Sequence, residues 1–167
     1  MQIRANGDLE ENNMAKQRIT EGAILEINIE NKYYVYAQIL KKGLGYAFFD
    51  YKTKEKLTNF QILNNSKVLF ILTVYDYVIT QCKWLKVGKL PIREDLLVQP
   101  MKFIQDEFNY KKLELYNPNT GEITPTTKDK IIGLERAAVW ADNHVEDRIR
   151  DHYLGVSNVW LEQMSIK

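Results

Sequence analysis

Alternating apolar and polar positions predict β-strands in the first half of the chain. Apolar and polar residues alternate over 25–29, and three polar residues separate this run from a second apolar run over 33–40. A turn with two glycines follows, and residues 46–51 supply a third run. The three runs predict an antiparallel meander.

The longest apolar stretch, residues 68–80, predicts a central strand. Its β-branched and aromatic residues fall on both faces, which is typical of a strand covered on both sides. Asp76 interrupts the stretch, and we expect a bulge or turn there in which its carboxylate accepts backbone N–H groups. The stretch is far shorter than the roughly 20 apolar residues of a membrane helix. Further short strands are expected over 84–87 and, as a second hairpin, over 113–116 and 122–124.

The C-terminal region changes period and predicts a helix over about 143–154. Apolar residues recur at intervals of four from Val145 onwards and define one stripe. Asp142 or Asn143 can cap the start, and Gly155 supplies the left-handed residue expected after the end.

Together these elements predict an α+β fold in one β-rich globular domain over 21–167. We expect a strongly curved antiparallel sheet or small barrel, made mainly from residues 22–124, with the C-terminal helix packed on it. Residues 1–20 contain few large apolar residues and predict a flexible arm. The expected core combines apolar residues of the strands and the helix: Leu25, Ile27, Val35, Ile39, Phe49, Leu69, Ile71, Trp84, Leu115, Val139, Val145 and Ile149.

The composition narrows the class of protein. With 167 residues, 45% of them hydrophobic, the chain is long and apolar enough to bury a core. Its formal net charge of +1 provides no overall field to attract nucleic acid or an anionic membrane. Cys82 is the one cysteine, so an internal disulfide is impossible, and we expect it to be reduced and buried. The polar N-terminus lacks the apolar segment of a secretion signal, which predicts a cytoplasmic protein.

Candidate catalytic groups are sparse. His144 and His152 lie two helical turns apart, too far to hold one metal ion. The glycines at 43 and 45 have no third glycine or helix after them, so they indicate a turn and not a phosphate loop. The paired carboxylates at Glu10–Glu11, Asp106–Glu107 and Glu146–Asp147 are sequence neighbours, which point in different directions. The sequence therefore predicts no catalytic residue, metal or cofactor, and a protein that is not an enzyme.

Aromatic residues concentrate in two consecutive predicted strands, with lysines at the strand ends. Such a pattern resembles a stacking platform for single-stranded nucleic acid, and a small nucleic-acid-binding β domain is the alternative function. Core packing explains the same pattern, because one face of a meander must cover the core. The aromatic residues concerned are Tyr33, Tyr34, Tyr36, Tyr46, Phe48, Phe49 and Tyr51.

Three stretches resemble the immunity protein 26 family of bacterial polymorphic-toxin systems, over nearly the whole length after residue 20. They are Glu21–Ile27 followed by Tyr34–Leu40, then Gly45–Asp50, and finally Leu134–Trp140 with His144–Tyr153. The resemblance implies a cytoplasmic protein that binds and neutralises a cognate toxin by direct contact. The polar arm before Gly22 departs from the family pattern.

Two regions have the composition of a protein-binding surface, in which tyrosines combine with charges that steer the partner. We expect them to contact the toxin, with Asp50 and Asp76 meeting basic residues that serve the toxin's substrate. The same residues taken singly also fit core aromatics and turn-forming acids. The first region is Tyr46, Phe48, Asp50 and Tyr51, and the second is Tyr75, Asp76 and Tyr77.

Overall fold

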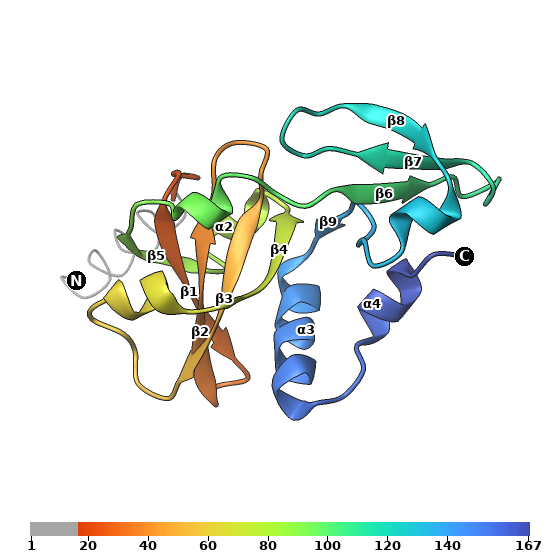
Figure 1. Cartoon of the computed structure of the whole chain (residues 1–167). Coiled ribbons are helices and arrows are strands. Elements are labelled where there is room, and N and C mark those ends of the chain that lie inside the picture. The colour runs from red at the N-terminus through yellow and green to blue at the C-terminus, as the bar shows by residue number, and fades with distance from the viewer. Residues whose placement is uncertain (1–16) are drawn as a thin grey trace, which may run out of the picture.

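The computed structural model describes residues 17–167, which form two β-sheets with helices packed beside them (Figure 1). The larger sheet has six strands in the order β5-β1-β2-β3-β4-β9, antiparallel except for the pair β4 and β9. Its strands are β1 Ala23–Ile29, β2 Tyr33–Ile39, β3 Tyr46–Thr53, β4 Val68–Val74, β5 Leu85–Lys89 and β9 Val139–Trp140.

The smaller sheet is an antiparallel meander of three strands, β6 Lys102–Gln105, β7 Leu113–Tyr116 and β8 Ile123–Thr126. The α-helices are α2 Tyr77–Thr80, α3 Asp142–Leu154 and α4 Val159–Met164. Short 3-10 turns occur at η1 Gln61–Asn65, η2 Glu94–Leu96 and η3 Lys128–Ile131. None of the helices within residues 17–167 has the length and apolar composition needed to cross a membrane.

The α+β class is confirmed, but the expected single sheet is wrong. Residues 102–126 pair only among themselves and with the segment before β9, because two short hairpins bring each strand beside its sequence neighbour. The large sheet runs from β5 at one edge to β9 at the other without closing. A barrel or a strongly curved sheet is therefore not found among the described residues.

The first three predicted strands form the meander β1-β2-β3, as expected. The long apolar stretch behaves differently, since β4 ends at Val74 and residues 77–80 form the short helix α2. A continuous apolar run does not distinguish a strand from a buried helical turn, and Asp76 marks the change. The expectation of one strand through Thr80 is wrong.

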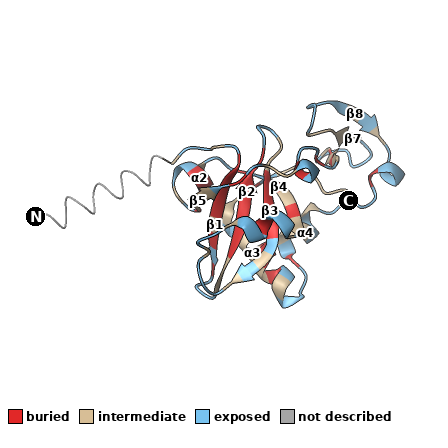
Figure 2. Cartoon of the chain, turned by 60° about the vertical axis from the view of Figure 1, so that its left-hand side comes forward, coloured by how far each residue is buried: buried red, intermediate tan, exposed pale blue. Residues whose placement is uncertain are grey.

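Both faces of the large sheet are buried (Figure 2). One face packs under α3, while η1 and residues 90–96 cover the other. Eight of the twelve predicted core residues are buried, but Leu69, Ile71 and Leu115 are only half-buried and Val139 is 46% exposed. In β4 the buried residues are Phe70, Leu72 and Val74, whereas Leu69 and Ile71 were expected in the core. The alternation of buried positions is thus shifted by one residue from the expected one.

Helix α3 matches its prediction closely. Val145 and Ile149 are completely buried against the large sheet, and Gly155 closes the helix in the left-handed conformation with φ of 69°. The expected side-chain cap is wrong: the N-cap residue is Ala141, and Asp142 is already helical.

The segment before β9 joins the two sheets. Glu135 accepts a hydrogen bond from the backbone of Phe103 in β6, and Ala137 donates one back to Phe103. Two residues later the same segment becomes β9 and pairs with Thr73 and Val74 in β4. Relative placement of the sheets is thus fixed by backbone hydrogen bonds.

Residues 17–20, the part of the predicted arm that the structure describes, lie against the large sheet. The Gln17 amide donates to the carbonyls of Ile79 and Trp84, and Lys86 donates to the Thr20 hydroxyl. The rest of the predicted arm lies outside the described residues.

Two glycines in the β2–β3 turn differ in how closely other atoms pack against them. Gly43 and Gly45 both have φ of +85°, but a Cβ at Gly45 would lie 2.6 Å from the Leu72 carbonyl oxygen, whereas one at Gly43 meets nothing within 4 Å. Gly43→Ala is expected to cost about 1–2 kcal/mol for the left-handed backbone alone, and Gly45→Ala more. Denaturant unfolding measures both, and equal losses would show that the turn relaxes freely.

Candidate functional site

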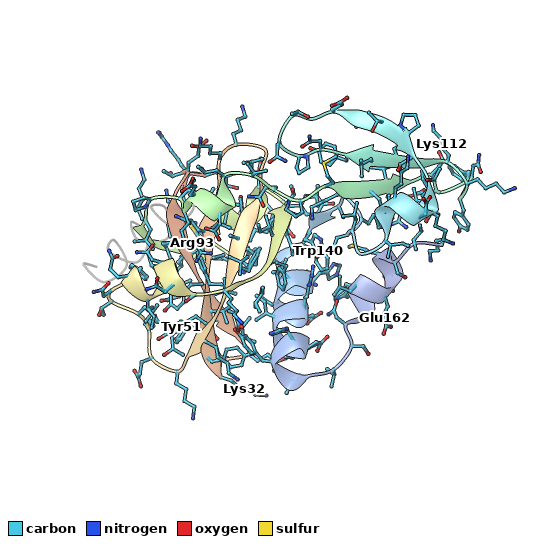
Figure 3. The ribbon with its side chains drawn as sticks, viewed as in Figure 1. Lys32, Tyr51, Arg93, Lys112, Trp140 and Glu162 are labelled. Carbon is cyan, nitrogen blue, oxygen red and sulfur yellow. The ribbon has the colours of Figure 1, made fainter. Side chains whose placement is uncertain are left out.

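The first predicted region is divided between the core and the surface. Tyr46 and Phe48 are only 6% and 1% exposed, and both pack in the core under α3. Asp50, two residues further along β3, is exposed. Tyr51, labelled in Figure 3, is half-buried against the opposite core. Tyr46 and Phe48 therefore have almost no surface to offer a partner.

Asp50 holds the last turn of α3. The Tyr153 hydroxyl donates to Asp50 Oδ1 at 2.9 Å, and burial together with this hydrogen bond raises the pKa of Tyr153. The Tyr153 ring meets Tyr33 edge to face, and the Lys52 ammonium lies over both rings. Asp50 is thus exposed and also a structural contact.

The second predicted region lies on the surface where β4 passes into α2. Tyr75 and Tyr77 stack with ring centroids 5.9 Å apart, and Tyr75 is 48% exposed. The Tyr77 hydroxyl donates to Asp142 Oδ1 at 3.2 Å, which joins this turn to the first residue of α3. The Tyr75 backbone donates to the Trp140 carbonyl, so β9 lies alongside. Figure 3 places Trp140 where β9 leads into α3.

Asp76, which separates the two tyrosines in the sequence, is exposed. Its carbonyl accepts hydrogen bonds from the Ile79 and Thr80 N–H groups, but its carboxylate makes no capping hydrogen bond, contrary to expectation. Burial raises the pKa of Tyr46 to about 12, and the nearby Asp76 charge adds to that rise. The Asp76 carboxylate is therefore not used in capping α2 and faces solvent.

These residues form one surface, which we call the aromatic–acidic patch and define as Tyr75, Asp76, Tyr77, Val139 and Asp142. It combines two stacked rings and an exposed apolar side chain with two carboxylates, fixed by β4, β9 and α3. Val139 was expected in the core and Asp142 as a helix cap, so their part in the patch was missed. Only the pairing of distant segments brings them together.

Negative charge continues along α3 from the patch. Glu146 lies one turn beyond Asp142 and accepts a hydrogen bond from the Trp84 indole at 3.4 Å. Burial raises the pKa of Glu146, and the charges of Asp142 and Asp147 raise it further despite that hydrogen bond. The end of α3 nearest the patch is therefore an acidic environment, suited to a basic partner.

The two predicted regions do not meet. Asp50 binds Tyr153 in the last turn of α3, whereas Tyr77 binds Asp142 in its first turn. At 1.5 Å per residue these positions lie roughly 17 Å apart along the helix. They form two separate surfaces.

A model of the immunity protein 26 family matches residues 20–114, more than half of the chain. The chain belongs to the immunity protein 26 family. Membership implies an immunity protein against a toxin. No curated protein and no solved structure matches the chain.

In this immunity protein the matched region and the rest of the chain both contribute to the patch. Tyr75, Asp76 and Tyr77 fall within the matched residues, whereas Val139 and Asp142 lie beyond them. Helix α3, also beyond the match, buries one face of the large sheet. The C-terminal third is thus part of the same packed structure.

The stacking platform of the nucleic-acid alternative is absent from the immunity protein. Tyr36, Tyr46, Phe48 and Phe49 are buried, so most rings of this set cannot stack on bases. Tyr33, Tyr34 and Tyr51 are half-buried, Tyr33 against the core under α3 and the other two against the opposite core. Core packing, the other interpretation of the pattern, accounts for the four buried rings.

The two histidines, which were candidates for catalysis or metal binding, both pack against aromatic rings. His144 stacks on Trp160 with centroids 3.6 Å apart, and His152 meets Tyr153 edge to face. Within residues 17–167, no group of three or more His, Cys, Asp or Glu side chains is placed to hold a metal ion. Cys82 is free, as expected, but only half-buried, with a positive φ of 56°.

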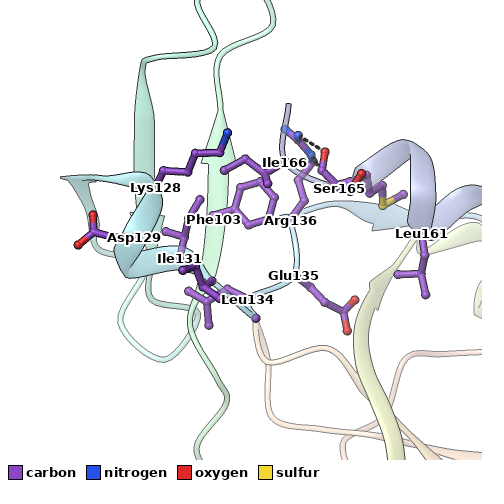
Figure 4. A pocket seen from close by; sticks show the side chains of 13 residues that line it. Phe103, Lys128, Asp129, Ile131, Leu134, Glu135, Arg136, Leu161, Ser165 and Ile166 are labelled. Carbon is purple, nitrogen blue, oxygen red and sulfur yellow. Dashed lines mark hydrogen bonds between the residues drawn. The ribbon is translucent and has the colours of Figure 1, made fainter.

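An apolar pocket of about 700 Å³ lies between α4 and the small sheet (Figure 4). Its walls include Phe103, Leu134 and Leu161. Arg136 points toward Ser165 and donates to the carbonyls of Met164 and Ser165. The polar groups of this pocket thus attach α4 to the small sheet.

Proposed function

We propose that this immunity protein neutralises its toxin by direct protein–protein contact through the aromatic–acidic patch. The supporting observation is the stacked tyrosine pair held beside Asp76 and Asp142. Tyrosine is enriched among residues that dominate binding energy, and carboxylates steer a basic partner and fix its orientation. We further propose that the protein works in the cytoplasm as part of a polymorphic toxin system, by binding and not by catalysis.

The proposed partner surface is basic. Asp76 and Asp142 would pair with lysine or arginine side chains of the toxin, while the tyrosine rings stack on arginine or pack against apolar side chains. If those basic residues serve the toxin's own substrate, their occupation by the patch blocks activity.

Removing one tyrosine ring or one carboxylate of the patch is expected to weaken toxin binding. Tyr75→Ala and Asp76→Ala should each reduce the affinity about tenfold, because each deletes a central contact group. Both residues are exposed, so folding should be unchanged. Titration calorimetry with the purified cognate toxin domain measures the affinity.

Matched controls lie on the turn between β6 and β7. Tyr110 is 55% exposed and Glu107 is also exposed, so Tyr110→Ala and Glu107→Ala remove the same kinds of group at a distant surface. They should bind as the wild type does. Wild-type affinity in both patch variants, with folding intact, would place the interface elsewhere.

Asp50 and Tyr51 are proposed as a separate contact, tested in the same titration. Asp50→Ala removes a carboxylate and also the acceptor of the Tyr153 hydroxyl. Tyr153→Phe removes the same hydrogen bond but leaves the carboxylate in place. A loss of affinity in Asp50→Ala alone supports contact with the toxin, whereas equal effects in both variants indicate a structural role.

A further inference from the structure

The side-chain amide of Gln17 bonds to backbone groups on two other segments of the chain. Its Nε2 donates to the Ile79 carbonyl at 2.8 Å and to the Trp84 carbonyl at 2.9 Å. Its Oε1 accepts the backbone N–H of Lys86 at 3.0 Å. Ile79 belongs to α2 and Lys86 to β5, and a primary amide has only two N–H groups, so both donors are used. One side chain therefore connects the N-terminal segment with α2 and β5.

Gln17 takes the place of a neighbouring strand at the open edge of β5. This strand is the last of the large sheet and pairs only with β1. Trp84 and Lys86 are two residues apart, so in an extended chain their backbone groups point to the same edge. A residue of a parallel strand would bond to the Trp84 carbonyl and the Lys86 N–H with its own N–H and C=O. The Gln17 amide makes these two hydrogen bonds instead, and it satisfies backbone groups that a strand edge otherwise leaves open.

Residues 17–20, which we call the N-terminal strap, are fixed at both ends. At the end opposite Gln17, the Thr20 hydroxyl accepts a hydrogen bond from Lys86 Nζ at 2.7 Å. The Thr20 carbonyl accepts another from the N–H of Ala23, the first residue of β1. Gln17 is therefore presented to its three backbone partners by a segment that is itself anchored to β1 and β5.

Gln17 also bridges a strained turn. Between α2 and β5 the chain passes through Cys82, whose φ of 56° lies in the left-handed region that residues other than glycine disfavour. The turn has backbone hydrogen bonds of its own, from Cys82 to Ile79 and from Trp84 to Val78. Ile79 and Trp84, whose carbonyls Gln17 binds, lie on either side of Cys82 in the chain. The amide therefore clamps this turn and fixes the end of α2 relative to β5.

The position of α2 affects the aromatic–acidic patch directly. The helix has four residues, about one turn, in which Tyr77 is the first and Ile79 the third. A displacement of the backbone at one end of so short a helix also displaces the other end. The Val78 and Ile79 side chains are completely buried and hold one side of α2 in the core, while Gln17 holds its carbonyl end. The Tyr77 ring in turn stacks on Tyr75. The Gln17 contact is thus only two residues from the surface proposed to meet the toxin.

We propose that Gln17 is a positioning residue of the toxin-binding surface: its amide holds the end of α2 and so orients Tyr75 and Tyr77. Gln17 acts through α2 and not by touching the toxin. The match to the immunity protein 26 family begins at residue 20, so this control comes from a residue outside the matched region. The inference rests on the proposed function, since it concerns the same aromatic–acidic patch.

NMR spectra of the free protein test the positioning without toxin. Gln17→Met keeps the length of the side chain but removes its three hydrogen bonds, and it is expected to shift the backbone amide signals of Tyr77 and Ile79. The Lys86 N–H should exchange with solvent about tenfold faster, because it loses its acceptor. An unshifted Tyr77 signal in the folded variant would overturn the inference, whatever the toxin does.

Gln105→Met is the matched control. The Gln105 amide makes the same three kinds of backbone hydrogen bond, because it donates to the Tyr110 and Lys167 carbonyls and accepts the Lys167 N–H. Gln105 lies in the small sheet, away from α2 (Figure 1). Its replacement should lower the melting temperature, as Gln17→Met does, but leave the Tyr77 signal unshifted. A shift of that signal in both variants would indicate a general loosening of the fold and overturn the inference.

Titration with the purified cognate toxin domain then links Gln17 to binding. Gln17→Met is expected to lower the affinity about threefold to fivefold, while Gln105→Met leaves it unchanged. In the Tyr75→Ala background the loss from Gln17→Met should become smaller, because both residues act on one surface. The full loss in that background would show that Gln17 acts elsewhere and overturn the inference.

The same variants separate this inference from the proposed function. Wild-type affinity in folded Gln17→Met, beside a loss in Tyr75→Ala, would overturn the inference and leave the proposed function standing. Wild-type affinity in Tyr75→Ala and Asp76→Ala, with the Tyr77 signal shifted by Gln17→Met, would contradict the proposed function and leave the positioning of α2 by Gln17 standing.

Discussion

Replacing Ile149 with alanine is expected to lower the free energy of unfolding by about 2–5 kcal/mol. Ile149 is completely buried and belongs to the core between α3 and the large sheet. The substitution removes three carbon atoms and leaves a cavity that the surrounding strands cannot fill without moving. Thermal or denaturant unfolding measures the loss.

Leu154→Ala is the control on the same helix. Leu154 is 66% exposed, so its truncation should change stability by less than about 0.5 kcal/mol. Since both variants make a similar deletion in α3, helix propensity affects them alike and burial is the main difference. An unchanged melting temperature for Ile149→Ala would contradict the packing of this helix face.

Local signals were sufficient for the meander and for α3. The strands β1 to β3 follow from alternation and from turns that the sequence marks with polar residues and glycines. Helix α3 follows from a four-residue period and the closing Gly155, which adopts the left-handed conformation. Each of these signals lies within the element that it predicts.

Elements defined by distant pairing were not predictable from the sequence. Strand β9 has only two residues and exists because Val139 and Trp140 pair with β4, some 65 residues earlier in the chain. In the same way, no local pattern assigns residues 102–126 to a second sheet. The apolar run over 68–80 also left its change from strand to helix undetermined, because both states bury such a run.

The candidate site also combines features that the local sequence predicts with features that only tertiary packing determines. Alternation groups Tyr46, Phe48 and Asp50 on one predicted face, but it does not say that α3 covers the first two. Tyr75 and Tyr77 reach the surface because α2 turns the chain away from the sheet. Asp142 joins them only through a tertiary hydrogen bond. Residue type thus identified candidate partner-binding residues, and the packing of α3 on the sheet determines which of them are accessible.

Replacing Arg148 with methionine is expected to cost about 3 kcal/mol of stability. The buried guanidinium donates two hydrogen bonds to Glu135, at 2.9 and 3.0 Å, and lies 4.0 Å from the ring centroid of Phe70. It therefore connects α3, β4 and the segment that joins the two sheets. Breaking a buried ion pair costs about 3–5 kcal/mol, and the lower end applies because the Glu135 side chain is 38% exposed.

The stability lost in Arg148→Met should be smaller in acid than at neutral pH. Burial raises the pKa of Glu135, but the hydrogen bonds and charge of Arg148, with the charge of Lys102, outweigh burial and lower it below the ordinary 4.5. Because the folded-state pKa is the lower one, the pair stabilises the protein fully above about pH 4.5 and loses this contribution as the pH falls through the folded pKa. The difference between wild type and Arg148→Met is expected to be larger at pH 7 than at pH 3.

A double-mutant cycle separates the ion pair from the packing of Arg148. Glu135→Gln removes the charge of the carboxylate, and the cycle with Arg148→Met measures the coupling between the two side chains. The exposed pair Lys32 and Glu30 provides the control, since Lys32→Met should have only a small effect at both pH values. No coupling in the Arg148 cycle, with a loss that is the same at both pH values, would show that Arg148 acts through Phe70 and Trp140. We expect strong coupling at pH 7 that disappears at pH 3, because only the ionised Glu135 carboxylate forms an ion pair with the Arg148 guanidinium.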